Sequence, residues 1–234
     1  MQFSVEKVPK ILTHLQRRWA KWSKEADPFT ILSINPSRIS HVTIGTSETD
    51  RVYDGDEYPD YTHDSTPDAG MFSSHRAGDI VGGEWDRKTI SFEKYVPYTS
   101  MQEHFENGTP WEDTRLYSNI TESISAGKEF WGCATEAEFR NERCEYIDEL
   151  YGKIEANGYL SQRELNQSNG QTDAYHEVEI NVARDGSLLF NDGKHRLSIA
   201  KLLDIEEIPV RVIVRHPERP IDEPKEDPEG RGGF

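Results

Sequence analysis

The sequence contains little cysteine. Only Cys133 and Cys144 are present among 234 residues, and their spacing fits neither a common zinc-binding pattern nor a C-x-x-C redox motif. We therefore expect two thiols that fill small gaps in the core, and a disulfide between them is the less favoured alternative. The cysteine content excludes a disulfide scaffold and the usual zinc folds.

Long apolar stretches are also absent. No run approaches the roughly 20 apolar residues that a transmembrane helix needs. The first residues, MQFSVEKVPKILTHLQRRW, lack the apolar core of a secretory signal peptide. We expect a cytoplasmic protein with no membrane span.

Basic residues are few relative to acidic ones. The chain has 27 Lys and Arg against 43 Asp and Glu, and its formal net charge is -16. A strongly anionic surface favours solubility and opposes binding to nucleic-acid phosphates. The balance is typical of proteins from salt-loving archaea, so it favours a halophilic, archaeal source, with an acidic mesophile as the alternative.

The two ends of the chain differ from the middle. Residues 1–27 place apolar side chains at helical spacing and predict a basic amphipathic helix, which we expect to dock on the domain rather than on a membrane. Residues 217–234 are rich in proline and acid and predict a disordered tail. Residues 28–216 are expected to form a single domain.

Within that domain, the sequence predicts both helices and strands. FTILSINPSRISHVTI reads as a strand broken at Asn35-Pro36, and EFRNERCEYIDELYGKIEANGY reads as a helix that ends at Gly158. YHEVEINVARDGSLLFND predicts a hairpin turning at Asp185-Gly186, followed by a helix from Lys194 to Leu203 and a closing strand, IPVRVIVRH. The pattern indicates an α+β fold with a small mixed sheet and packed helices.

The helix that begins near Lys194 is the strongest candidate site. Its start presents unpaired backbone N–H groups and the positive end of the helix dipole. Lys194, His195 and Arg196 add cationic or polar side chains, and Gly193 lets an anion approach the backbone, so the turn suits a phosphate or carboxylate. A structural reading stays open, in which Arg196 pairs with Asp192 or a strand carboxylate and His195 caps a carbonyl.

The residues DGKHRLSIAKLL…IPVRVIV resemble the ParB/sulfiredoxin-like superfamily, whose members carry a G-x-x-R or G-x-H-R box between a strand and a helix. The resemblance is specific over about 190–214 and weaker back to Arg140. It implies a ParB/sulfiredoxin-like domain that binds ATP, ADP or CTP with Mg²⁺, its phosphates on Gly193, His195 and Arg196. Lys194 stands where sulfiredoxin has its reactive cysteine, which argues against that chemistry, and Asp192 would help to hold a metal.

The segment from about 43 to 139 has no counterpart in the minimal family domain and is expected to be an insertion. Residues 45–84 hold ten acidic and two basic residues. The run GDIVGGEWDR begins near their end, and in it Gly82-Gly83 precedes Glu84, Trp85 and Asp86. We expect these last three residues to form a lid over the Gly193 turn.

Three classes of function fit this pattern. The first is a nucleotide-dependent phosphotransferase or hydrolase, in which Asp192 and His195 are catalytic and Glu177, Glu179, Glu84 and Asp86 are further candidate carboxylates. The second is a ParB-like DNA-binding protein or nuclease, favoured only by a basic strip formed by Lys194, Arg196, Lys201, Arg211 and Arg215. The third is a non-catalytic ligand sensor or scaffold. We favour binding of a nucleotide or another phosphorylated ligand, with turnover left open.

Overall fold

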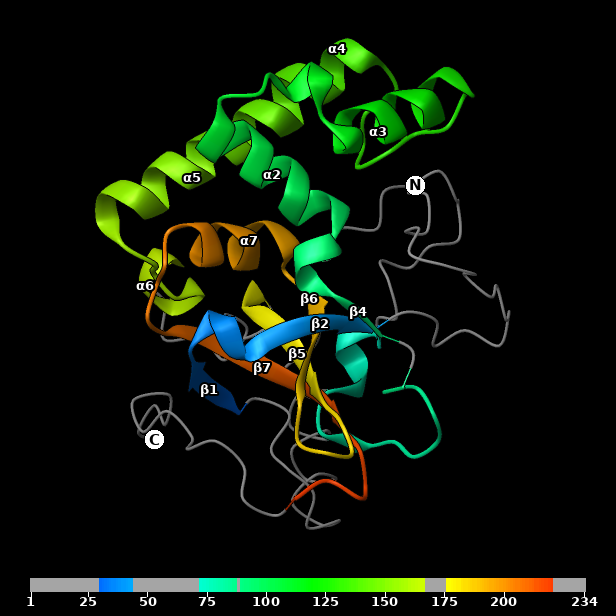
Figure 1. The fold of residues 1–234 in the computed structure, drawn as a ribbon, viewed down its shortest axis with the longest axis vertical. Helices are drawn as coiled ribbons and strands as arrows, with labels where there is room; N and C mark the ends of the chain where they lie inside the picture. Colours follow the sequence, from blue (N-terminus) through cyan, green and yellow to red (C-terminus); the bar gives the residue numbers. More distant parts are fainter. Residues whose placement is uncertain (1–29, 44–71, 88, 167–175, 221–234) are drawn as a thin grey trace.

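The computed structural model describes residues 30–43, 72–87, 89–166 and 176–220. The helix expected over residues 1–27 and all but the first four residues of the expected tail lie outside this part of the chain. The described residues form a mixed α+β structure in which helices lie over one face of a mixed sheet (Figure 1).

The sheet has seven strands in the described residues. Its main path runs β1 (Ile31–Ile34), β7 (Ile208–Arg215), β5 (Val178–Val182), β6 (Leu188–Asp192), β2 (Ile39–Thr43) and β4 (Thr89–Ser91), and β3 (Asp79–Ile80) pairs with the end of β7. The β5–β6 pair is the hairpin expected from the sequence, and β7 joins β5 in parallel. The expected break between β1 and β2 is a short 3-10 turn at Pro36–Arg38, after Asn35.

The helices pack on one face of the sheet. α7 (Lys194–Leu202) lies against the strands, and α2 (Val96–Asn107) and α5 (Glu145–Asn157) lie over α7, as Figure 1 shows. α3 (Arg115–Ser125) and α4 (Glu136–Glu138) lie further from the sheet, and α6 (Gln162–Asn166) follows α5. A π-helical turn at Phe139–Cys144 joins α4 to α5, so the helix expected there is continuous but locally widened.

Alternation along the central strands creates two cores. Val178, Ile180 and Val182 of β5 face the helices and belong to the larger cluster. Glu179 and Asn181, between them, face the other side, which is the consequence of a side-chain period of two. That second face is covered by a smaller cluster made of Phe72, Trp85, Ala183, Leu189, Ile213 and Val214.

The described part of the expected insertion is built into both layers. β4 extends the sheet beside β2, and β3 pairs with β7. α2 and α3 contribute Met101, Leu116 and Ile120 to the larger core. Residues 72–87 and 89–139 therefore share the core of the rest of the described chain instead of having one of their own.

Candidate functional site

The turn between β6 and α7 is built around a glycine. Gly193 is the N-cap of α7 and adopts φ +89°, which L side chains rarely tolerate. A Cβ atom at this position would lie 3.0 Å from the Cα of Val178 on β5. The glycine is therefore needed for the turn conformation and for packing on β5, in addition to any access it gives a ligand.

In the part of the chain that the structure describes, the first turn of α7 has no side-chain cap. Glycine offers no side-chain acceptor, and the preceding carboxylate of Asp192 accepts from the N–H of Gly193 itself, at 2.6 Å. Helix starts usually use Ser, Thr, Asp or Asn as N-cap to satisfy the first amides. An uncapped start of a nine-residue helix is suited to an external anion.

A tight turn from Phe130 to Cys133, hereafter the Trp131 turn, lies against this helix start. Phe130 and Cys133 exchange two backbone hydrogen bonds of 2.9 Å, and Trp131 and Gly132 between them have φ of +52° and +81°. Two positive φ angles are the signature of a type I′ turn, which is unusual for tryptophan. Arg143, on the π-helical turn, donates to the Trp131 carbonyl through Nε at 2.9 Å and through Nη2.

Lys194 and His195 both meet the ring of Trp131. The Lys194 Nζ lies 4.7 Å from the ring centroid, a cation–π distance, and the His195 ring meets Trp131 edge-on at 5.3 Å between centroids. Tyr146, about half exposed, has its ring centroid 6.5 Å from that of His195. The sequence candidates Lys194 and His195 are thus brought together, with Trp131 and Tyr146 added.

The imidazole of His195 is held uncharged. The residue is only partly buried, yet its Nε2 is shielded from solvent and has no hydrogen-bond partner in the described residues. Burial, with smaller contributions from the charges of Lys194 and Arg143, lowers the pKa of His195 from 6.5 to about 3. His195 therefore provides a neutral ring at physiological pH rather than a positive charge.

Arg196 points away from this group. Its Nη1 donates to Glu177 Oε2 at 3.1 Å and to the His176 carbonyl, its Nη2 donates to the Leu160 carbonyl, and its guanidinium lies 4.4 Å from the Tyr159 ring centroid. This is the structural arrangement left open by the sequence, with Glu177 as the strand carboxylate instead of Asp192 or Glu179. Arg196 fastens α7 to the segment before β5.

Asp192 and Glu179 lie opposite each other on neighbouring strands. They are register partners of β6 and β5, and Glu179 is also the register partner of Arg211 on β7. Glu179 pairs with Arg211 at 3.2 Å, and burial raises the pKa of the Glu179 carboxyl. Asn191 and Ser74 also donate to Glu179, so the expected insertion reaches this region through Ser74.

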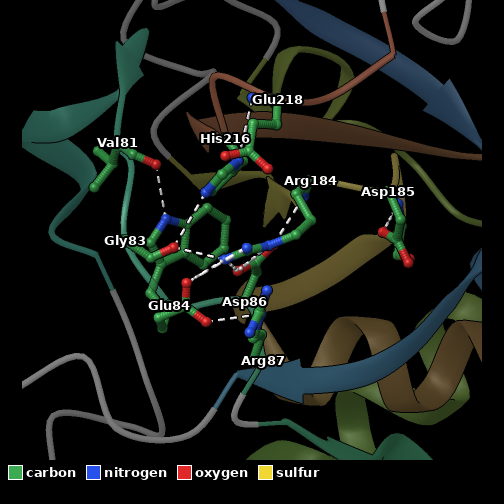
Figure 2. Close-up of polar contacts among 11 residues, drawn as sticks. Val81, Gly83, Glu84, Asp86, Arg87, Arg184, Asp185, His216 and Glu218 are labelled. Carbon is green, nitrogen blue, oxygen red and sulfur yellow. Dashed lines mark hydrogen bonds and ion pairs between the residues drawn. The ribbon is translucent and has the colours of Figure 1, made fainter.

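The lid expected from Glu84, Trp85 and Asp86 is wrong. Asp86 binds the backbone and side chain of Arg184, and Glu84 and the Gly83 carbonyl contact the same guanidinium (Figure 2). Arg184 lies in the turn that leads into β6, whereas Gly193 follows the last residue of β6, about 17 Å from the start of that strand at the usual rise. Trp85 packs in the smaller core beside Phe72 and His216.

The expected basic strip is not a surface feature. Arg211 and Arg215 are each 1% exposed and Lys194 is 8% exposed, while the Arg196 side chain is largely buried against Glu177. Within the described residues, no group of three or more His, Cys, Asp or Glu side chains could hold a metal ion. No described helix is long and apolar enough to cross a membrane.

Sequence reasoning missed Trp131, Arg143 and Tyr146. The dipeptide Trp131-Gly132 was a usable turn signal, but nothing in the spacing indicated that this turn meets a helix more than 60 residues later. The two arginines of the π-helical turn, three positions apart, gave no hint that Arg143 alone reaches the Trp131 carbonyl.

Comparison with known proteins adds no family to this geometry, because no family model, curated protein or solved structure matches the chain.

Proposed function

We propose that this protein binds a phosphorylated ligand, and most specifically a nucleotide, at the start of α7. The observation that carries the proposal is the first turn of α7, whose glycine N-cap provides its amides with no side-chain acceptor among the described residues. Amides at a helix start and the helix dipole together favour a phosphate group.

Within the Gly193–Arg196 box, the positive charge proposed to bind the phosphate comes from Lys194. Lys194 lies at the helix start with its ammonium at the Trp131 ring, and it acts as a point charge for a phosphate oxygen. His195 adds a neutral ring, and Arg196 is committed to Glu177. The proposed anion site is therefore made of amides and Lys194, and it is less cationic than the sequence suggests.

The choice of a nucleotide rests on two features. The strand, glycine turn and helix from Leu188 to Leu202 have the order that the ParB/sulfiredoxin-like resemblance implies, and we propose that type of domain for this chain. The half-exposed Tyr146, 6.5 Å from His195 between ring centroids, also places an aromatic ring near the anion site, where a base can stack. ATP, ADP and CTP are the ligands to test, with Mg²⁺ carried on their phosphates.

Turnover of the nucleotide is the finer part of the proposal. Asp192 is the carboxylate adjacent to the anion site, and it can hold Mg²⁺ or accept a proton from an attacking hydroxyl. Glu179, the register partner of Asp192 on the neighbouring strand, is instead buried in the ion pair with Arg211. If phosphate is released from ATP or CTP, Asp192→Asn is expected to abolish release while nucleotide binding persists.

Calorimetric titration tests the binding itself. We expect ATP, ADP or CTP, with Mg²⁺, to bind the full chain, and Lys194→Met to weaken that binding about tenfold or more, equivalent to about 1.4 kcal/mol. Lys201→Met is the matched control, because Lys201 lies in the last turn of the same helix with its ammonium 5.2 Å from the Phe92 ring. Equal affinity of the two variants, or no binding by any nucleotide, would refute the site.

Binding of DNA through the basic strip has lost its support. Contacts to the backbone of a DNA duplex need several cations on an open surface, and Arg211 and Arg215 are buried within β7. Electrophoretic mobility shifts of duplex DNA at moderate salt should show weak binding at most.

A further inference from the structure

The Trp131 turn lies against the start of α7, where the Trp131 ring contacts Lys194 and His195 and the edge of the larger core beside Phe139. We propose that Trp131 is a gate that swings away from Lys194 and His195 when the ligand enters. This inference rests on the proposed phosphate site and adds its regulation.

The first argument is that Trp131 and a phosphate need the same ammonium. The Lys194 Nζ lies 4.7 Å from the centroid of the Trp131 ring, so the ring is one of its partners in this structure. An ammonium that moves to a phosphate oxygen leaves the ring and weakens the contact that holds the turn closed. Ligand binding and closure of the Trp131 turn therefore oppose each other, which is the differential interaction that a ligand needs to shift a conformational equilibrium.

A buried ring nitrogen beside Trp131 also favours opening. Among the described residues, His195 Nε2 has no hydrogen-bond partner and is shielded from solvent, although an imidazole nitrogen strongly prefers a partner or water. The ring that meets His195 edge-on belongs to Trp131. Movement of Trp131 gives the His195 nitrogen access to water or to the ligand, so the closed form carries an unfavourable contact that the open form relieves.

The third argument is the construction of the turn itself. Trp131 has φ +52°, a conformation that a bulky residue adopts only when its surroundings impose it. The Arg143 guanidinium donates to the Trp131 carbonyl, and Cys133, two residues after Trp131, is buried and anchors the turn. Gly132, exposed and also at positive φ, separates the strained residue from that anchor and is suited to act as the hinge.

Chemical labelling of His195 by diethyl pyrocarbonate tests the gate without any ligand. The reagent modifies neutral imidazole, and the extent at each histidine is read by mass spectrometry. In the wild-type chain we expect His195 to react at least tenfold more slowly than His41, which is exposed. Arg143→Gln, which releases the Trp131 carbonyl, should raise the rate at His195 at least fivefold with the rate at His41 unchanged.

Arg140→Gln is the matched control on the same π-helical turn, because Arg140 pairs with the exposed Glu112 and not with Trp131. It should leave the labelling of His195 unchanged. Equal rates at His195 in the wild type, Arg143→Gln and Arg140→Gln would overturn the gate. So would an equal rise at His195 in both arginine variants, since that would indicate general loosening of the turn.

Calorimetry with ATP and Mg²⁺ then separates the gate from the site it covers. A gate that competes for Lys194 predicts that Trp131→Ala binds ATP more tightly than the wild type, by about threefold or more. Weaker binding would make Trp131 part of the binding surface, and unchanged binding would make it architecture; either result overturns the gate. Absence of ATP binding in every variant would refute the proposed function, and the labelling result would then decide separately whether the turn opens.

Discussion

Arg196 on α7 donates to Glu177 through Nη1 at 3.1 Å, and the two side chains are 12% and 4% exposed. From the sequence alone, Arg196 was a candidate ligand contact, because it lies in the Gly193–Arg196 box. In the structure its hydrogen bonds run to Glu177 and to two backbone carbonyls, so it ties α7 to the chain that precedes β5.

Arg196→Ala should therefore destabilise the protein. Removal of one partner leaves the Glu177 carboxylate buried without its charge partner, and we expect a loss of about 3–5 kcal/mol in the free energy of unfolding. Urea denaturation measures it. Lys153→Ala is the control, since its pair with Glu149 is exposed on both sides and should contribute less than about 1 kcal/mol. A normal stability for Arg196→Ala, together with lost nucleotide affinity, would return Arg196 to the ligand site.

Two glycine-to-alanine substitutions should change the free energy of unfolding in opposite directions. Gly193→Ala places a methyl group 3.0 Å from the Val178 Cα at φ +89°, and we expect it to cost about 2 kcal/mol or more. Gly152→Ala lies within α5 with open space around the added Cβ, and it should stabilise the protein by about 0.5–1 kcal/mol. Thermal and urea unfolding check both, and a neutral Gly193→Ala would show that the turn is less constrained than its geometry indicates.

The lowered pKa of His195 predicts a specific acid sensitivity. The pKa of this ring is about 3 in the folded chain and 6.5 ordinarily, so below pH 6.5 the unfolded state binds a proton that the folded state does not. Stability associated with His195 is thus fully present above about pH 6.5 and is lost as the pH falls toward 3. His195→Asn should flatten this part of a plot of unfolding free energy against pH. An NMR titration that shows His195 protonating near pH 6.5 would contradict the burial of its ring.

Asp86, at the hairpin end of the sheet, should cause a second loss of stability at a lower pH than His195. Burial alone would raise the pKa of Asp86, but hydrogen bonds from Arg184 outweigh it and lower the pKa from 3.8 to about 2 (Figure 2). The sign is that of a depressed carboxylate: stability is present above about pH 4 and is lost between 4 and 2. Asp86→Asn should remove this loss, whereas Arg87→Ala, from an exposed pair with Glu84, should leave it in place. Unfolding curves between pH 2 and 5 make the comparison.

The C-terminal half of the fold was predictable because its signals are local. Alternation at Val178, Ile180 and Val182, the Asp185-Gly186 turn and the helix after Gly193 each depend on neighbouring residues. The candidate site was only half predictable, since Lys194 and His195 are neighbours in the sequence whereas the aromatic rings beside them, Trp131 and Tyr146, come from a different part of the chain.

The failures share one physical cause. Trp85 and Asp86 looked like a lid because a glycine pair precedes them, yet their position depends on the long-range contact of Asp86 with Arg184 in the β5–β6 turn. The basic strip looked like a surface because β7 alternates with arginines, and only the second layer of packing buries them. Single-sequence patterns report the face on which a residue lies, but not what later covers that face.

The central claim is that phosphate binds at the first turn of α7. Amide chemical-shift mapping of the full chain, titrated with ATP and Mg²⁺ and separately with inorganic pyrophosphate, tests it most directly. The account predicts that the N–H resonances of Gly193, Lys194 and His195 and the Trp131 indole shift together at the same ligand concentration, with those of Arg184 at the far end of the hairpin unmoved. Saturable shifts confined to other elements, or no shifts at millimolar ligand, would contradict it.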